Sequence, residues 1–173
     1  MQTANPTTLV YPAPGWVQMD ADEYLRLTKL GIKECIAQMK EQGLDPGKIK
    51  AVMGDGIICG IVGIDAQGRA ITPYINYLDS RTQGDAAELC RQELDIWGRE
   101  TGNPEPLCMF PALHARWLLK NNEAFKAAGA KFVHNAPYIL MNLAGLRAAD
   151  AFIDWGTMSG WGLGYDVYKK QWS

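Results

Sequence analysis

The chain has 173 residues, of which 47% are apolar and 21% charged, and its formal net charge is −2. This length supports one well-filled core rather than two full domains, and the charge gives no electrostatic basis for binding nucleic acid or an anionic membrane. Its apolar runs fall far short of the roughly 20 residues that span a bilayer, and its polar N-terminus is unlike a signal peptide. Four cysteines without a C-x-x-C pair indicate reduced thiols rather than a zinc site. These features predict a cytoplasmic globular protein.

The first half of the chain predicts a short strand at residues 8–11 and then a long helix. Asp20 or Asp22 caps this helix, apolar residues recur on one of its faces, and Gly43 follows its end near Gln42. A turn at residues 44–47 comes next. Three further strands are expected, at residues 49–53, 60–64 and 71–77, the last two joined as a hairpin.

The second half predicts mostly helices and ends in a segment rich in glycine and aromatic residues. Helices are expected at residues 82–101, 111–121, 122–128 and 136–143, with a strand at residues 131–134 and an irregular or hairpin segment through residues 165–168. This order of elements indicates an α/β fold with a mixed sheet and flanking helices.

Five motifs, taken in chain order, resemble one protein family. Residues 11–20 (YPAPGWVQMD) are similar to a tyrosine-proline then glycine-tryptophan-valine pattern, residues 77–81 (YLDSR) to W-x-D-x-R, and residues 101–104 (TGNP) to T-G-N-P. The others are residues 60–65 with Gly68, and residues 154–159 (DWGTMS) with 162–166. Trp117-Leu118-Leu119 continues the T-G-N-P motif in register. Together they resemble the FGGY carbohydrate kinases over roughly residues 11–172.

The resemblance implies a partial RNase H-like N-terminal domain, of the type found in actin and hexokinase, formed by residues 1–173 as one unit. In this family a D-x-G-T-T phosphate hairpin precedes the tyrosine-proline motif, and the catalytic aspartate follows the position of Trp172. We therefore expect no catalytic base in this chain and no activity of the chain alone. ATP and Mg²⁺ are the cofactors expected of the complete enzyme, and the remaining kinase polypeptide is the expected partner.

The resemblance also places the sugar against the loop at residues 54–60. Xylulokinase-like members carry methionine-histidine at the positions of Ile58 and Cys59, and glycerol kinase-like members carry arginine-glutamate there. This chain has neither pair, which leaves the sugar open. Asp55 is then the polar group best suited to accept bonds from two hydroxyls, although Gly54-Asp55-Gly56 also fits a simple tight turn.

Further substrate contacts follow from the next two motifs. Tyr77 replaces a family tryptophan whose ring packs on the sugar, and its alternative role is that of a core aromatic. Asp79 is expected to bind hydroxyls or to pair with Arg81, for which a structural role is favoured. Met109 and Phe110 align with the region that closes over the sugar, or fill the core.

Three other polar residues are interpreted as structural. His114 is expected to be an exposed helix residue, while His134 and Asn135 precede a proline and are typical of helix caps. Glycines near the end predict a hairpin with unusual backbone angles.

Three functions remain open from the sequence. The first is the sugar side of an ATP-dependent carbohydrate kinase, a transferase, present here as a fragment. The second is a non-catalytic carbohydrate-binding or regulatory module derived from such a kinase, and the third is an interaction domain without a ligand. An unpaired strand edge at residues 8–11 would favour a homodimer.

Overall fold

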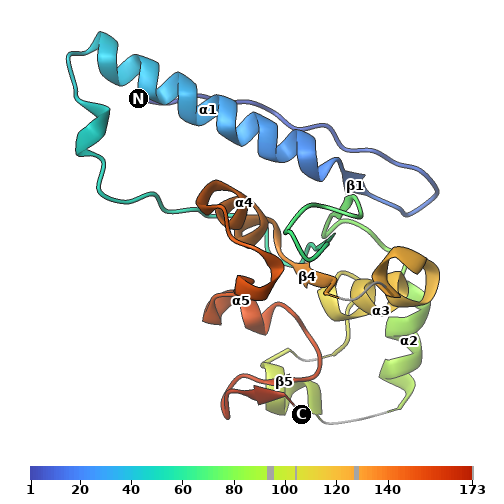
Figure 1. The fold of residues 1–173 in the computed structure, drawn as a ribbon. Helices are drawn as coiled ribbons and strands as arrows, with labels where there is room; N and C mark the ends of the chain where they lie inside the picture. The colour runs from blue at the N-terminus through green and yellow to red at the C-terminus, as the bar shows by residue number, and fades with distance from the viewer. Residues whose placement is uncertain (93–95, 104, 127–128, 173) are drawn as a thin grey trace.

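The structure is a computed structural model that describes residues 1–92, 96–103, 105–126 and 129–172. A long helix lies along one side of the molecule, and the remaining elements form a body beside it (Figure 1). The helices are α1 (Ala21–Glu41), α2 (Gln83–Arg91), α3 (Pro111–Asn121), α4 (Asn135–Ala144) and α5 (Trp155–Ser159). The strands are β1 (Gln18–Met19), β2 (Val62–Ile64), β3 (Tyr74–Ile75), β4 (Lys131–Val133), β5 (Tyr165–Asp166) and β6 (Gln171–Trp172).

Helix α1 begins and ends where local chemistry predicts. The Asp20 carboxylate accepts hydrogen bonds from the backbone N–H groups of Asp22 and Glu23, at 2.9 and 3.1 Å, and so satisfies donors that lack partners within the helix. Gly43 follows the helix with a φ of +71°, the left-handed conformation that glycine adopts readily. The predicted cap and stop of this helix are therefore confirmed.

Four of the strands lie side by side. Antiparallel pairing joins β1 to β3 and β2 to β4, and a bridge between Ile61 and Ile75 connects the two pairs. A second bridge, between Ile64 and Ala70, closes the predicted hairpin around the turn at residues 65–68. Strands β5 and β6 form a separate antiparallel pair. The predicted α/β class is confirmed, and every pairing within the described residues is antiparallel.

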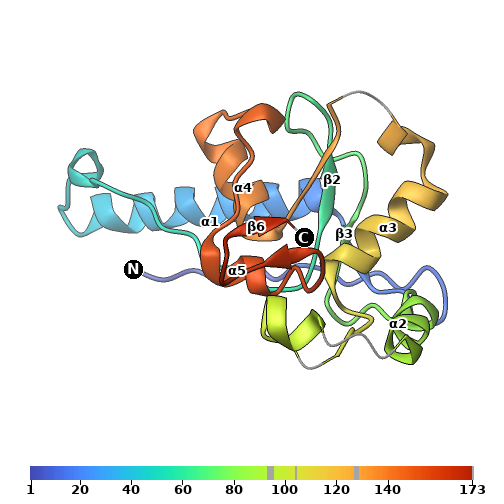
Figure 2. The ribbon, with the colours of Figure 1, turned by 90° about the horizontal axis from the view of Figure 1, so that it is seen from below.

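The core lies on both faces of this small sheet. Val62 and Ile64 pack with Tyr138 and Met141 of α4, whereas Ile61 packs with residues of α3 on the opposite face. This alternation is the period of two expected along a strand. Figure 2 shows α4 and α3 on different sides of β2.

Gly63 belongs to the second face and lies against Phe125. A Cβ atom at this glycine would stand 1.7 Å from Phe125 Cζ, so the position has no room for a side chain.

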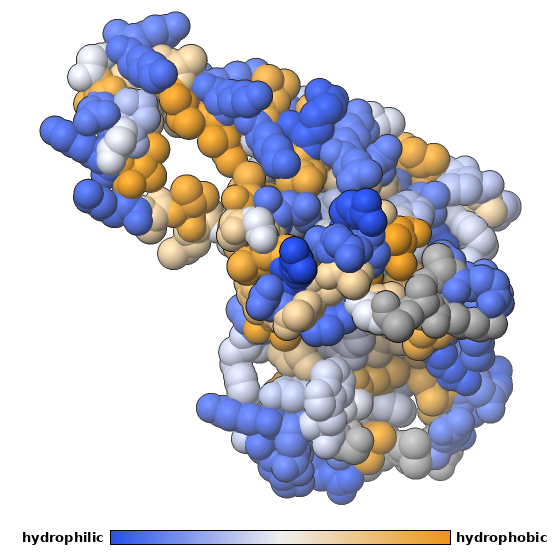
Figure 3. Space-filling model, in the orientation of Figure 1, coloured by the Kyte–Doolittle hydropathy of each residue, from blue (hydrophilic) through white to orange (hydrophobic). Residues whose placement is uncertain are grey.

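Two predicted strands are not formed. Residues 8–11 contribute only a bridge between Val10 and Gln18, and residues 49–53 pair with no described strand. In the second segment Val52 is 68% exposed and Met53 96%, because their backbone runs beside solvent rather than inside a sheet. Figure 3 shows hydrophobic surface along the side of α1 that faces this segment.

Two predicted helices are shorter than expected. The helix predicted at residues 82–101 ends at Arg91 and is followed by a π-helical turn, Trp97–Thr101; residues 93–95 lie outside the described residues. The helix predicted at residues 122–128 is a 3-10 turn, Glu123–Lys126, and residues 127–128 are outside the described part. Further 3-10 turns occur at Pro46–Lys48 and Ala148–Asp150. Among the described helices, none has the length and apolar character needed to cross a membrane.

Candidate functional site

The loop at residues 54–60 forms one wall of a small hollow of about 70 Å³. Asp55 and Ile58 line it on this side. His134 and Asn135, at the start of α4, and Asp154 with Thr157, at the start of α5, line it on the other. Two carboxylates, an amide and an imidazole are therefore gathered from three segments that lie far apart in the sequence.

Asp55 is one of the two exposed carboxylates that line this hollow. One of its oxygens, Oδ1, accepts a hydrogen bond of 2.8 Å from the backbone N–H of Gly56. A carboxylate has about four acceptor positions, so Asp55 retains capacity for hydroxyl donors. Asp154, on the other side of the hollow, has fewer free acceptor positions, because it accepts hydrogen bonds from the N–H and the hydroxyl of Thr157. These bonds lower the pKa of Asp154.

Cys59 turns the loop back into the sheet in an unusual conformation. Its φ is +66°, which L-residues other than asparagine and aspartate rarely adopt, and its side chain is buried. The thiol donates to the Gly160 carbonyl across 3.5 Å, and burial raises its pKa. Cys59 therefore shapes the loop as a neutral thiol, and backbone strain of this kind is common at ligand sites.

Tyr77 follows β3 and does not line the Asp55 hollow. Because Ile61 is bridged to Ile75 in antiparallel register, positions 59 and 77 fall at the same end of that pairing. The Tyr77 side chain is 40% exposed, which leaves its ring available to a ligand.

Asp79 does not face solvent, unlike the ligand contact expected from the sequence. Its exposed fraction is 0%, and Oδ2 accepts a 2.6 Å hydrogen bond from the backbone N–H of Val17. Arg81 donates to both carboxylate oxygens, from Nε at 2.9 Å and Nη2 at 2.8 Å. The guanidinium also lies 4.0 Å from the ring centroid of Trp16 and 4.8 Å from that of Trp117. In this structure Asp79 anchors the chain and has no surface for a hydroxyl.

Met109 and Phe110 lie in a hydrophobic cluster at the start of α3. Phe110 is 2% exposed, and Met109, half-buried, packs against the same cluster. The segment at residues 160–162 lies between this cluster and the loop. A Cβ at Gly160 would meet the Ile58 side chain at 2.6 Å, and one at Gly162 would meet the Phe110 ring at 2.2 Å. Ile58 and Phe110 are thus linked through this segment, and both define the shape of the region.

Sequence reasoning missed the burial of both histidines. His114 was expected to be exposed but is fully buried, with Nε2 3.6 Å from Asp79 Oδ1. Burial lowers its pKa to about 4, helped by Arg81 and opposed by Asp79. The signal was present in the helical spacing, because His114 shares a face with Trp117 and Leu118.

His134 and Asn135 also differ from the prediction that they cap a helix. His134 occupies the N-cap position of α4, but its side chain makes no capping hydrogen bond. Among the described residues Asn135 Oδ1 has no hydrogen-bond partner, and the ring nitrogens of His134 have none of ordinary geometry, although the Gly60 carbonyl lies near the ring. Burial lowers the pKa of His134 to about 4, against the opposing effects of the Gly60 carbonyl and Asp154. Both side chains are therefore neutral polar groups with unused hydrogen-bonding capacity.

The cofactors expected of a complete enzyme can be tested against these residues. The described residues contain no group of three or more His, Cys, Asp or Glu side chains arranged to hold a metal ion. We therefore assign no Mg²⁺ site to the described residues.

Comparison with known proteins gives the family. Residues 2–173 match the N-terminal domain of the FGGY family of carbohydrate kinases. A glycerol kinase from Nitratidesulfovibrio vulgaris is 30% identical over 129 residues, which cover 72% of this chain and 24% of the relative. A glycerol kinase from Haloferax volcanii is 32% identical over 158 residues, covering 88% of this chain and 28% of the relative.

Solved structures agree with this result. The xylulose kinase from Rhodospirillum rubrum has a TM-score of 0.79 and 26% identity, with coverage of 95% of this chain and 32% of that one. The Plasmodium falciparum glycerol kinase with ADP has a TM-score of 0.78 at 20% identity, covering 96% and 33%. The chain spans about a quarter to a third of the length of these relatives. Its fold is part of the actin- and hexokinase-like fold of sugar kinases, and the chain belongs to the FGGY family of carbohydrate kinases.

Proposed function

We propose that this chain supplies the sugar-binding side of an ATP-dependent carbohydrate kinase, which phosphorylates a hydroxyl of a sugar or polyol. The observation that carries the proposal is the match of residues 2–173 to the N-terminal domain of these kinases. In this proposal residues 1–173 are one partial domain, whose partner is the rest of the kinase polypeptide. The expected location is the cytoplasm, as the sequence predicts.

The loop at residues 54–60 is the proposed place of sugar binding. Asp55 accepts hydrogen bonds from sugar hydroxyls, for which its exposed carboxylate is suited. Ile58 and Cys59 set the shape of the site, and Tyr77 offers its exposed ring to the C–H face of the sugar. Phe110 lies against the segment at residues 160–162, which in turn lies against Ile58, and Met109 packs on the cluster that contains Phe110.

Asp79 has a different proposed role, as a positioning residue. Its carboxylate joins Val17, Arg81 and, through His114, helix α3. This network holds the turn that follows Tyr77, so that the ring keeps one orientation. The role of Asp79 is then to reduce the motion of Tyr77 rather than to touch the sugar.

The chemistry of phosphoryl transfer requires alignment of the acceptor hydroxyl, stabilisation of charge on the phosphates, and a base for the hydroxyl proton. We propose that this chain provides only the first of these. The base and the ATP and Mg²⁺ sites then belong to other parts of the complete enzyme, and the chain alone is inactive.

Ligand-induced stabilisation tests the sugar site directly. A ligand that binds only the folded state at a hundred times its Kd stabilises the fold by about 2.7 kcal/mol, so a binding sugar raises the melting temperature. The ligand set comprises glycerol, pentuloses, hexuloses and gluconate. Asp55→Asn should remove the shift, whereas Asp45→Asn, in an exposed turn outside the hollow, should keep it.

Two results would overturn the proposal. The first is an Asp55→Asn variant that responds to the stabilising sugar as strongly as the wild type does. The second is the absence of any shift across this set of ligands. An ATP-consumption assay on the full-length protein separates the alternatives, because a non-catalytic carbohydrate-binding module shows the same shift but its full-length protein consumes no ATP with the sugar.

A further inference from the structure

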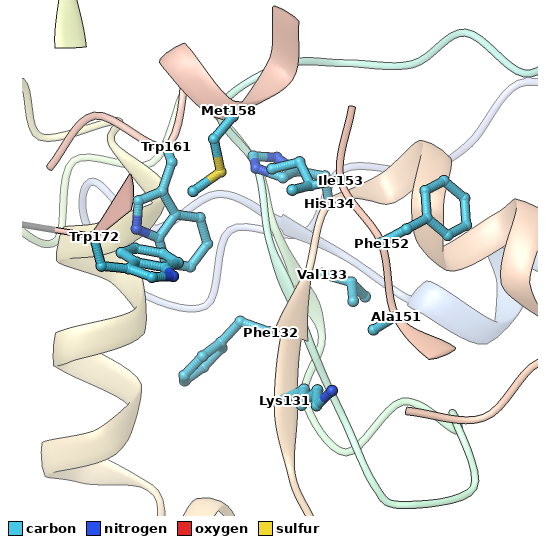
Figure 4. A pocket seen from close by; sticks show the side chains of 10 residues that line it. All are labelled: Lys131, Phe132, Val133, His134, Ala151, Phe152, Ile153, Met158, Trp161 and Trp172. Atoms are coloured by element: carbon cyan, nitrogen blue, oxygen red, sulfur yellow. The ribbon is translucent and has the colours of Figure 1, made fainter. Parts of the chain in front are cut away.

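A second pocket lies beside β4 and shares His134 with the hollow that Asp55 lines. Its volume is about 190 Å³, and the described residues that line it come from β4, the segment before α5, α5 itself and the C-terminal hairpin. Figure 4 shows Trp161 and Trp172 together on one side, Met158 above, and Val133 with Ala151 opposite. The space between them is surrounded by hydrophobic side chains.

The floor and the rim of this pocket differ in exposure. At the floor, Val133, His134 and Met158 are between 2% and 7% exposed. At the rim, Phe152 is 42% exposed and Trp172 63%. A ligand that enters would therefore cover aromatic surface that water now contacts, which is the main source of affinity in small-molecule sites.

The aromatic walls are held in place before any ligand arrives. Phe132 stacks on Phe125, with ring centroids 4.3 Å apart and an interplanar angle of 11°. Trp172 meets Tyr165 edge to face at 5.2 Å and Trp161 at 6.5 Å. Walls that are already ordered lose little conformational entropy on binding.

Two polar groups give the pocket its chemical preference. The ring nitrogens of His134 form no hydrogen bond of ordinary geometry with the described residues, although the exposed fraction of this residue is 2%. At the outer end stands the exposed ammonium of Lys131, and the lining includes no carboxylate. The pocket thus combines flat aromatic walls, a buried imidazole and a single cation, a set that complements an aromatic ring bearing a carboxylate.

We propose that this pocket binds a small aromatic monocarboxylate, with its ring against Trp161 and Trp172 and its carboxylate near Lys131. Its volume admits one ring with a short side chain, because a cavity of about 150 Å³ is known to hold benzene. The site is separate from the sugar loop, and His134 lies between the two hollows.

Fluorine NMR of the 173-residue chain tests this site with 4-fluorophenylacetate as the probe. We expect saturable broadening of its signal and a shift of the Trp161 indole N–H resonance. The uncharged 2-(4-fluorophenyl)ethanol should bind about threefold more weakly, because it lacks the ion pair with an exposed lysine. A probe without saturable binding would overturn the proposal.

Two surface substitutions assign the binding to this pocket. Lys131→Met should weaken binding of the acid about threefold without affecting the alcohol, and Trp172→Ala should weaken both about fivefold. Lys50→Met and Tyr168→Ala are matched controls at exposed positions outside the lining. All four positions are exposed, so the fold should persist, which circular dichroism verifies. If the pocket variants behave like their controls, binding occurs elsewhere and the proposal is wrong.

Discussion

Arg81 donates two hydrogen bonds to the carboxylate of Asp79, and both side chains are almost completely removed from solvent, at 3% and 0% exposure. The pair lies where three parts of the chain meet, because Asp79 also accepts a hydrogen bond from the Val17 N–H and the guanidinium lies over the rings of Trp16 and Trp117. Charge, hydrogen bonding and aromatic packing therefore converge on two residues that follow the proposed sugar platform, Tyr77.

Arg81→Met should be strongly destabilising. The substitution leaves the Asp79 charge buried without its partner, a change that typically costs about 3–5 kcal/mol of unfolding free energy. The control is Arg69→Met, because Arg69 pairs with Asp65 at 2.7 Å on the surface, where its side chain is 74% exposed. That change should cost less than about 1 kcal/mol. Urea unfolding measures both, and similar losses would contradict the structural role given to Asp79 and Arg81.

Acid should destabilise the fold through its two histidines. Burial lowers the pKa of both His114 and His134 to about 4, whereas the unfolded chain protonates near 6.5. Between these values the unfolded state binds more protons than the folded state. The contribution of the two histidines to the free energy of unfolding is therefore fully present above pH 6.5 and is lost as the pH decreases toward 4. Each histidine should contribute a loss of about 2 kcal/mol between pH 7 and pH 5.

His114→Gln removes one of these titrations and leaves the other. Its loss of stability between pH 7 and pH 5, measured by urea unfolding, should be about 2 kcal/mol smaller than that of the wild type. The double substitution with His134→Gln removes every histidine of the chain and should lessen the pH dependence further. A variant as pH-sensitive as the wild type would show that His114 is already protonated in the fold.

Local sequence was a good guide where local interactions decide the structure. Helices α1 and α3 were predicted because Asp20, Gly43 and Pro111 signal their ends within a few residues. The strand predicted at residues 49–53 is not formed, because a strand requires a neighbouring strand to pair with. A short window of sequence does not show whether the fold supplies that neighbour.

The candidate site was harder to predict for the same reason. Asp55 and Ile58 were identified through the family resemblance, but their neighbours His134 and Asp154 lie 76 or more positions along the chain. Likewise, the burial of Asp79 depends on Val17, which is 62 positions away. Contacts over such distances are set by the packing of the whole fold.

Gly60 should be intolerant of even one added methyl group. A Cβ atom there would stand 1.8 Å from Tyr74 Oη and 2.8 Å from the Ile75 carbonyl oxygen, and Tyr74 is fully buried and unable to move aside. Gly60→Ala should therefore lower stability by about 2 kcal/mol. Gly84→Ala, in α2, meets nothing within 4 Å and should be neutral or stabilising by up to about 1 kcal/mol. Thermal or urea unfolding compares the two, and equal effects would contradict the tight packing beneath the loop.

Self-association through unpaired backbone is the last prediction. Residues 8–11 are held to the body by the bridge between Val10 and Gln18. Residues 49–53 pair with no described strand, and Met53 in this segment is 96% exposed. Extended segments with unpaired N–H and C=O groups and apolar side chains recruit another chain. Light scattering should show a mass that rises with concentration, and Met53→Lys or Tyr11→Lys should lower it, whereas Leu119→Lys, at a half-exposed helix position, should not. A wild-type chain that stays monomeric at every concentration would mean that these segments do not associate.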